Sequence, residues 1–441
     1  MQPSLYLVLF CLLIGIVAIV LLTTRFRLHP FFALLIASLL VGTGVGLPVG
    51  DVVNFVKEGF GNIMRSLGLI IVLGTALGAV LEKTGSTRKM AGFLMRTIGK
   101  KYPAMAMGIT GFIVGMPLFC DSGFIVLSGL NASFARKTNM PVVVLAVAMA
   151  TGLYSVHCLI PPHPGAAAAA STLGVDYGKL ILAGILVAIP AMLIGNIYAR
   201  YAGMKMAATT DHPDTVDEPI AADGPGVLHS FLPVIVPVLL IAARSFLAIE
   251  KNGKANSILL VLGDPVVALA IGLLLAITLI TKKNRNGLTG WLQEGAEKAG
   301  GILVIIGAGG GFGAVLNATK IGPLFSEALP LAGMGLLFPF LLCFVLKTAQ
   351  GSSTVAIITG ASIIQPLLPA LGFTSPDGKL LCVLAMGAGS MMISHANDAY
   401  FWVISRFEKI GMKEMLRVYS IATILMGLIS LATIYLFSFL L

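Results

Sequence analysis

Two acidic residues stand in short polar stretches that interrupt long apolar runs of the sequence. Asp121 follows Met116–Cys120, and Asp398 follows Ile393–Asn397. A carboxylate in apolar surroundings is rare and often carries a proton, because burial raises the pKa of the carboxyl group into the range where it can bind and release one. We expect Asp121 to be the main proton carrier and Asp398 a second one, and helix capping is the alternative role of each.

The chain has four such stretches, at 116–123, 157–165, 348–353 and 393–398, which contain many small polar residues. Hydroxyl and free backbone N–H groups can bind a carboxylate and the hydroxyls of a substrate. No arginine stands in any stretch, and Lys347 is the nearest fixed cation unless its side chain extends to the membrane interface. The residues expected to bind substrate are Asp121, Ser122, Gly123, His157, His163, Gly351, Ser352, Ser353, Thr354, Ser394, His395, Asn397 and Asp398.

Histidines stand in two of the stretches. His157 and His163 flank Pro161-Pro162, and two histidines six residues apart across a proline do not form a metal pair on one helix face. A hydrogen-bonding or proton-relay role is one interpretation, and binding of freed backbone carbonyl groups is the other. His395 stands in the matching stretch of the second half. We expect neither a metal ion nor a cofactor.

A glycine-rich run at Gly307–Gly313 resembles a nucleotide loop but lacks the following Lys-Ser or Lys-Thr. It lies in an apolar segment, so close helix packing is the favoured interpretation. The sequence also has no Ser-His-Asp arrangement and no His-Glu-x-x-His motif. We therefore expect that the protein is not an enzyme.

The composition indicates how these residues are positioned. Of the 441 residues, 57% are hydrophobic and 11% are charged, and apolar runs of about 20 residues match the thickness of a bilayer. The net charge of +10 raises the possibility of nucleic acid binding, but the basic residues lie in short loops beside apolar segments. We expect an all-α integral membrane protein in a lipid bilayer, with no nucleic acid partner.

An internal repeat relates the two halves at a constant spacing of 235 residues, and three groups of matches share one register. The matched groups are Pro30, Ala33, Leu34, Ile36, Leu39 and Thr43 with Pro265, Ala268, Leu269, Ile271, Leu274 and Thr278; Gly74, Gly78–Leu81 and Thr84 with Gly309, Gly313–Leu316 and Thr319; and Ala150, Gly152 and Ser155 with Ala385, Gly387 and Ser390. We expect transmembrane repeats over 1–204 and 228–441, joined by a polar cytoplasmic linker over 205–227.

Each half divides in the same way. The simple spans are expected near 5–24, 29–47, 66–82 and 178–199 in the first half, and near 228–247, 262–281, 299–317 and 418–440 in the second. Each half adds two interrupted segments, which in the first half cover 103–135 and 141–173. The polar breaks should meet near the midplane, where the N-termini of half-helices offer free N–H groups to an anion.

The loop charges decide how the first interrupted segment runs. If 103–135 is a re-entrant hairpin, most of the 29 lysines and arginines fall on one side, which the positive-inside rule assigns to the cytoplasm. Each half then crosses the membrane five times, as four simple spans plus one broken helix. Because five is odd, the second repeat is inverted relative to the first, as in many secondary transporters. Both termini are expected on the periplasmic side.

The sequence resembles the gluconate permease family, the gluconate:proton symporters of bacterial inner membranes. The residues that carry the resemblance are Gly115-x-Pro117-Leu118-Phe119-x-Asp121-x-Gly123-Phe124, His157-x-x-x-Pro161-Pro162-His163-Pro164-Gly165, Asn397-Asp398-x-x-Phe401-Trp402 and, more weakly, Gly309-Gly310-x-Phe312-Gly313. The resemblance covers the whole chain. It implies proton-coupled uptake of gluconate or a related small hydroxycarboxylate across a bacterial inner membrane, and its relatives also carry glycerate or D-serine.

Two alternatives to a proton-coupled carrier remain at this point. Serine, asparagine and backbone carbonyl groups at the breaks are also suited to sodium, so Na⁺ is the alternative coupling ion. A passive anion channel or a receptor is a more remote alternative, because the duplicated breaks favour alternating access.

The spans outside the hairpins and broken helices are expected to form a scaffold, and a homodimer interface on that scaffold is left open.

Overall fold

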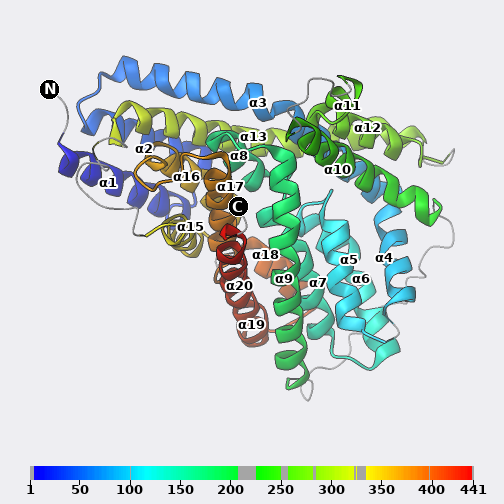
Figure 1. Ribbon diagram of the computed structural model, residues 1–441. Coiled ribbons are helices and arrows are strands. Elements are labelled where there is room, and N and C mark those ends of the chain that lie inside the picture. The colour runs from blue at the N-terminus through cyan, green and yellow to red at the C-terminus, as the bar shows by residue number, and fades with distance from the viewer. Residues whose placement is uncertain are drawn as a thin grey trace.

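The computed structural model describes residues 4–99, 101–206, 225–249, 257–281, 285–321, 324, 334–396 and 398–439, and every regular element in those ranges is helical. The first half contains α1 (Leu5–Thr24), α2 (Pro30–Gly44), α3 (Val49–Lys83), α4 (Ser86–Thr97), α5 (Pro103–Gly115), α6 (Cys120–Thr138), α7 (Val142–Leu159), α8 (Pro164–Leu173) and α9 (Tyr177–Met204). Figure 1 shows these helices packed with those of the second half into one body.

The second half contains α10 (Val227–Ile249), α11 (Ser257–Leu262), α12 (Pro265–Ile277), a 3₁₀ turn at Arg285–Gly287, α13 (Leu288–Ala318), α15 (Leu337–Gln350), α16 (Ser353–Ile364), a 3₁₀ turn at Gln365–Leu367, α17 (Pro376–Met391), α18 (Ala399–Phe407), α19 (Met412–Met415), a π-helical turn at Leu416–Ser420 and α20 (Ile421–Ser438). Seven helical stretches in the described ranges are long and apolar enough to cross a membrane. The predicted all-α membrane fold is confirmed. Most of the predicted polar linker, 207–224, lies outside the described residues.

The helix boundaries repeat with the spacing of the sequence repeat. Boundaries that lie 235 residues apart are the starts of α2 and α12 at Pro30 and Pro265, the ends of α3 and α13 at Lys83 and Ala318, the ends of α5 and α15 at Gly115 and Gln350, the starts of α8 and α18 at Pro164 and Ala399, and the starts of α9 and α19 at Tyr177 and Met412. The sequence repeat therefore corresponds to a repeated arrangement of helices.

The helices α3 and α13 are longer than the sequence analysis predicts. The spans expected at 66–82 and 299–317 begin at Val49 and Leu288 in the structure, so the predicted boundaries are wrong at these ends. In α3 the extension continues a buried face through Val52, Gly59 and Ile63. Because that spacing keeps the three side chains on one side of a helix, the chain stays helical although the opposite side is polar.

These two long helices pack together along one edge of the molecule (Figure 1). Gly59 of α3 meets Gly310 of α13, and Ala76 meets Gly295, so the two equivalent helices run in opposite directions. A Cβ atom on Gly59 would lie 2.3 Å from the Gly310 carbonyl oxygen, which shows how closely the backbones approach. Antiparallel packing of equivalent helices is what inverted halves require, and the orientation of the halves in a membrane stays a prediction.

The interrupted segment that contains α5 and α6 turns back as predicted. Residues at the start of α5, Lys101 and Pro103, line the same cavity as Lys137 and Thr138 at the end of α6. Both ends of the segment therefore lie on one side of the molecule. In the second half, α15 and α16 pack against each other around a turn at Gly351, whose φ of +81° favours glycine.

Broken helices complete each half. In the first, α7 and α8 are separated by residues 160–163, and in the second α17 and α18 are separated by 392–398. The helix α8 packs against α16, whereas α18 packs against α6, so each broken helix contacts the hairpin of the other half. This exchange brings all four breaks to the middle of the molecule.

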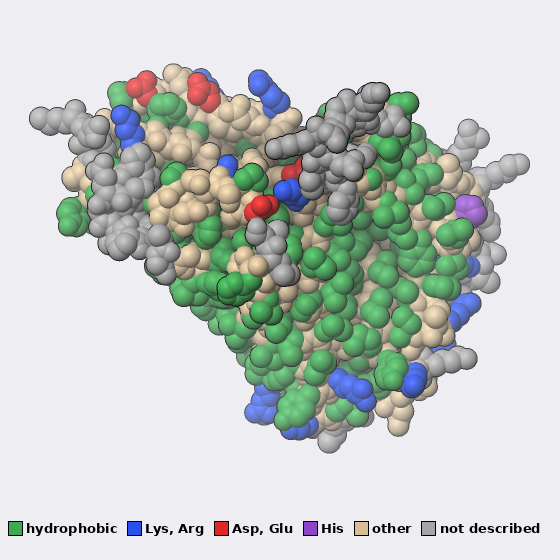
Figure 2. Space-filling view, in the orientation of Figure 1, with side chains coloured by type: hydrophobic (Ala, Val, Ile, Leu, Met, Phe, Trp, Pro, Cys, Tyr) green, Lys and Arg blue, Asp and Glu red, His purple; other side chains and the backbone are tan. Residues whose placement is uncertain are grey.

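The outer surface matches that of a membrane protein. Figure 2 shows hydrophobic side chains over α9 and α20, with lysine and arginine gathered at the lower edge of that face. Large apolar side chains such as Ile197 and Leu428 are 59% and 48% exposed there. Such a broad apolar face is suited to lipid rather than to water.

Candidate functional site

Four helix N-termini meet around one cavity of about 550 Å³. The helices α6, α8, α16 and α18 each contribute their first turn or the residue before it, and the cavity lining includes Cys120, Pro164, Ser353 and Ala399. The first N–H groups of a helix lack partners within the helix and carry partial positive charge. These helix starts favour negative charge in the cavity, and Ser352 and Asp398 already accept from first-turn N–H groups of α16 and α18.

The structure brings most of the sequence-predicted site residues to this cavity. The predicted residues that line it are Asp121, Ser122, His157, Gly351, Ser352, Ser353, Thr354 and Asp398. Gly123, His163, Ser394 and His395 lie behind the lining, and Asn397 lies outside the described residues.

Two of the residues behind the lining hold the first hairpin in place. Gly123 packs against α7, where a Cβ atom would lie only 2.7 Å from Leu153 Cδ2. The His163 ring is buried, and its Nε2 atom lies 2.8 Å from the carbonyl oxygen of Gly115 at the end of α5. His163 thus binds a carbonyl group freed by the break, which is the second of its two predicted roles.

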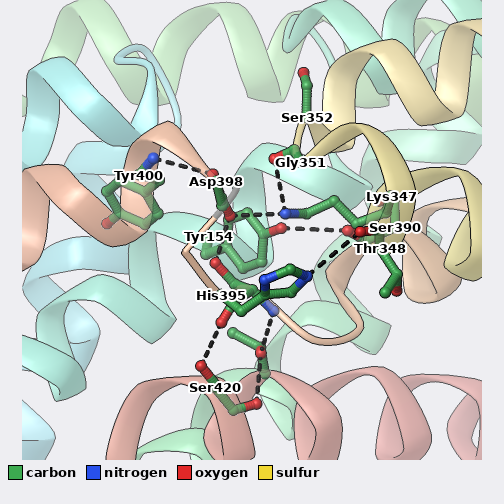
Figure 3. Close-up of polar contacts among 12 residues, drawn as sticks. Tyr154, Lys347, Thr348, Gly351, Ser352, Ser390, His395, Asp398, Tyr400 and Ser420 are labelled. Atoms are coloured by element: carbon green, nitrogen blue, oxygen red, sulfur yellow. Dashed lines mark hydrogen bonds and ion pairs between the residues drawn. The ribbon is translucent and has the colours of Figure 1, made fainter. Parts of the chain in front are cut away.

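Asp398 forms a buried ion pair with Lys347. The Lys347 side chain is 0% exposed, and its Nζ atom donates to Asp398 Oδ2 at 2.7 Å and to the Gly351 carbonyl oxygen at 2.9 Å (Figure 3). The alternative in which Lys347 extends to the membrane interface is therefore wrong. The other carboxylate oxygen of Asp398 accepts from the backbone N–H of Tyr400 at 3.0 Å, so Asp398 also caps α18.

Ser394 and His395 lie in the break between α17 and α18 and make further contacts near this ion pair. The Ser394 hydroxyl donates to Asp398 Oδ2, and the backbone N–H of Ser394 donates to the Thr423 hydroxyl at 3.0 Å. The His395 Nε2 atom lies 3.4 Å from the Thr348 carbonyl oxygen near the end of α15 (Figure 3). The His395 contact joins the second broken helix to the second hairpin, and the Ser394 backbone contact joins it to α20.

Asp121 has very different surroundings. It stands in the first turn of α6, is half-buried, and has Cys120 Sγ at 3.7 Å from Oδ1. Among the described residues no lysine or arginine forms an ion pair with it. The two carboxylates at the cavity therefore differ, since one is neutralised by a buried lysine and the other is not.

Four polar residues of the lining are not among the predicted site residues: Tyr154, Lys298, Gln350 and Tyr400. Lys298 reaches the cavity from α13, and its Nζ atom lies 2.9 Å from Glu294 Oε1, while Lys83 Nζ lies 3.1 Å from Glu294 Oε2. No sequence signal links Lys298 to the site, because it lies in the unpredicted extension of α13 and reaches the cavity through tertiary packing. Gln350 stands in a predicted break but was not among the expected site residues.

Buried polar atoms without partners face the same region. Within the described part of the chain, both side-chain polar atoms of Gln350 and the Nδ1 atom of His157 have no hydrogen-bond partner. The other ring nitrogen of His157 lies 3.2 Å from the Thr354 hydroxyl. Buried polar atoms are nearly always paired, so these atoms mark residues of the lining whose hydrogen bonding is incomplete in this structure. In the same described ranges, no group of three or more His, Cys, Asp and Glu side chains is arranged to hold a metal ion.

A comparison with known protein families shows to which family the chain belongs. The family model of the GntP family permeases matches residues 7–440. The chain belongs to this family. Gluconate permease of Pseudomonas aeruginosa is 32% identical over 438 residues, which cover 97% of this chain and 96% of the relative. The D-serine transporter of Escherichia coli is 30% identical over 437 residues, which cover 97% of each chain.

The fold of this permease also resembles a solved transporter structure. The crystal structure of the Alcanivorax borkumensis YdaH transporter aligns with a TM-score of 0.66 at 15% identity, over 93% of this chain and 98% of that one. The family and the relatives show that the chain is a multi-pass membrane permease and not an enzyme, as predicted from the sequence.

Proposed function

We propose that this permease is a proton-coupled symporter that imports gluconate or a related small hydroxycarboxylate through the cavity between the hairpins and broken helices. The family and its relatives support a substrate of this class. The family resemblance implies that the permease lies in the bacterial inner membrane, and the named relatives are bacterial.

The convergence of four helix N-termini carries the proposal. A carboxylate that accepts hydrogen bonds from the N–H groups at the starts of α6 and α16 would lie in the favourable field of both helices. The hydroxyls of Ser122 and Ser353 lie at those same helix starts and add donors. Lys298 adds an ammonium group at the lining, and the group formed by Lys83, Glu294 and Lys298 keeps one net positive charge, so the cavity favours an anion over a neutral sugar.

The hydroxyl groups of the substrate have their own partners. Gln350 can donate and accept through its amide, and His157 offers a ring nitrogen that has no partner among the described residues. A substrate with both a carboxylate and several hydroxyls would satisfy these atoms. A small inorganic anion would leave them unpaired, which is unfavourable for buried groups.

Asp121 is the proposed proton carrier. An ionised carboxylate without a cation partner is unfavourable in apolar surroundings, and proton binding relieves this. Asp398 is a weaker candidate, because Lys347, Ser394 and the Tyr400 N–H all stabilise its ionised form. The carried proton would thus bind to Asp121, while Asp398 keeps its contact with Lys347.

Transport by the purified protein tests the proposal. Labelled gluconate uptake would be measured in proteoliposomes with an inward proton gradient, without sodium, and with an uncoupler control. Accumulation above the external concentration that the uncoupler abolishes is expected. If accumulation needs sodium instead of a proton gradient, the coupling ion is Na⁺. If gluconate only reaches the external concentration with either ion gradient, the protein is not a symporter.

The Asp121→Asn variant tests the proton carrier in the same vesicles. We expect it to lose uphill accumulation but to keep exchange of labelled for unlabelled gluconate, since exchange needs no net proton movement. Asp217→Asn, in the polar linker, is the matched control and should accumulate gluconate normally. Normal accumulation by Asp121→Asn would contradict its role.

D-serine is the second candidate substrate, because a D-serine transporter is among the relatives. The same helix N-termini would bind its carboxylate, and the unpaired Asp121 carboxylate would face its ammonium group. Competition separates the two: unlabelled D-serine should displace labelled gluconate poorly if hydroxyl groups determine specificity.

A further inference from the structure

A second group of cavities, lined in part by basic residues, lies away from the substrate cavity, where α5 begins and α9 ends. One cavity of about 610 Å³ is lined by Lys101, Tyr102, Arg200, Tyr201 and Lys205, among others. It shares no lining residue with the substrate cavity. Its polar lining is thus basic and aromatic.

A neighbouring cavity of about 870 Å³ extends this region toward the end of α6. Its lining includes Arg96, Lys101 and Lys137, and the two cavities share Lys101, Pro103 and Met140. Neither lining contains an aspartate or a glutamate. The two cavities therefore adjoin each other, and together they are here called the basic cleft, which has positive charge and no acidic residue in its lining.

Lysines of the basic cleft contact aromatic rings. Lys205 Nζ lies 2.6 Å from the Tyr201 hydroxyl oxygen and 3.9 Å from the centre of the Tyr201 ring. Lys101 Nζ lies 5.3 Å from the centre of the Tyr102 ring. In the described ranges no carboxylate pairs with Lys101, Arg200 or Lys205. Cation–π contacts orient an ammonium group but leave its charge available to an external anion.

The position of the basic cleft indicates the source of that anion. The membrane-crossing stretch of α9 ends at Met204, so Arg200 and Lys205 lie where that helix leaves the apolar layer. Tyr102 and Tyr201 are 50% and 60% exposed, as is common for tyrosine at a membrane interface. Ile197, one turn before Tyr201, lines the same cavity and is 59% exposed, so an apolar surface adjoins the charges.

We propose that the basic cleft binds the headgroup of an anionic phospholipid, with the phosphate at Arg200, Lys205 and Lys101 and an acyl chain along the exposed apolar side of α9. The ligand class is a phosphodiester attached to apolar chains, as in phosphatidylglycerol. A basic pocket between membrane helices with an adjacent apolar surface matches both parts of such a molecule. This site is separate from substrate transport and does not depend on the proposed substrate.

Native mass spectrometry of the full-length protein tests the site. The detergent-purified protein would be titrated with phosphatidylglycerol or with phosphatidylcholine of the same acyl chains. We expect tighter binding of phosphatidylglycerol, and the Arg200→Gln/Lys205→Gln variant should weaken it by about 25-fold, or roughly fivefold for each charge removed. The matched control is Lys57→Gln/Arg65→Gln, which removes two exposed charges of α3 that line neither cavity.

Several outcomes would overturn the proposal. Equal binding of the two lipids, or equal loss in the control variant, would mean that the basic cleft does not select anionic lipid. Displacement of phosphatidylglycerol by soluble glycerol phosphate at similar concentrations would indicate a soluble phosphate ligand instead. If the glutamine variant unfolds, Arg200→Lys/Lys205→Arg keeps both charges and should retain the preference for phosphatidylglycerol.

Discussion

The Lys347 ammonium group lies fully inside the protein, where an isolated charge would be very unfavourable. Its 2.7 Å contact with Asp398 removes that penalty only while both partners are charged. We expect Lys347→Met and Asp398→Asn each to destabilise the protein by about 3–5 kcal/mol, because each leaves one buried charge unpaired.

The double variant Lys347→Met/Asp398→Asn removes both charges and should recover most of this loss. The measurement is thermal unfolding of the four proteins in one detergent, analysed as a double-mutant cycle. Additive losses in the double variant would show that the two residues do not stabilise each other.

Lys298 is a charged cavity residue outside the predicted set, and it has a natural control. Both Lys298 and Lys83 pair with Glu294, but only Lys298 lines the cavity. We expect Lys298→Ala to raise the KM for gluconate about tenfold, because the variant loses one charge-assisted contact worth about 1.5 kcal/mol. The maximal rate should change little, and Lys83→Ala should leave KM within about twofold.

Initial uptake rates in proteoliposomes over a range of gluconate concentrations give both constants. Lys298→Arg keeps the charge and should restore most of the affinity. A KM that rises equally in Lys83→Ala and Lys298→Ala would mean that the charge network stabilises the scaffold and does not bind substrate.

At the scale of elements, the contact between α3 and α13 depends on glycine. An alanine at Gly59 would place its Cβ atom 2.3 Å from the backbone of Gly310, so the two helices would have to separate. We expect Gly59→Ala to lower stability by about 1–3 kcal/mol, the usual effect of overpacking.

Gly61, two residues away, provides the control for this contact. It has no atom within 4 Å of an added Cβ, and Gly61→Ala should leave stability unchanged or raise it by up to about 1 kcal/mol. Unfolding temperatures of both variants in one detergent test the difference. Equal effects would mean that the helices are not in backbone contact there.

A second link between elements joins the first hairpin to the loop after α18. Asn131 of α6 donates to Glu408 Oε1 at 2.6 Å, and burial raises the pKa of Glu408 from 4.5 to about 8. Because the pKa in the folded protein is the higher one, the stabilising contribution of Glu408 is complete below about pH 4.5. It is lost progressively as the pH rises to about 8.

The unfolding temperature should therefore fall between about pH 5 and pH 8, by an amount equivalent to a few kcal/mol. Glu408→Gln removes the ionisable group but keeps the amide contact, and it should flatten this part of the pH profile. Glu58→Gln, an exposed carboxylate of α3, is the control and should keep the wild-type slope. An unchanged slope in Glu408→Gln would show that another group is responsible.

The sequence predicts the breaks well because proline and glycine mark them locally. The turn at Gly351 and the break before Pro164 fall where those residues indicate. The sequence predicts the extension of α3 poorly, since polar Lys57 and Arg65 lie on its exposed side and interrupt the apolar run. The Lys347–Asp398 pair joins residues 51 positions apart, and no local pattern gives such a contact.

At the scale of the whole molecule, the two halves exchange contacts reciprocally. Packing of α6 on α18 is matched by packing of α16 on α8, and α3 and α13 run in opposite directions. Reciprocal contacts of this kind are expected of two repeats related by a two-fold axis. If the axis lies in the membrane plane, a chain with five crossings in each half has both termini on one side and the linker on the other.

Reporter fusions test this arrangement in living bacteria. Green fluorescent protein inserted in the 205–227 linker should fluoresce, because the positive-inside rule places the linker in the cytoplasm. Alkaline phosphatase fused after Leu441 should be active, because we expect the C-terminus in the periplasm. The opposite result at Leu441 alone would give the second half an even number of crossings and exclude inverted repeats, whereas reversal at both positions would keep the inversion and reverse only its orientation.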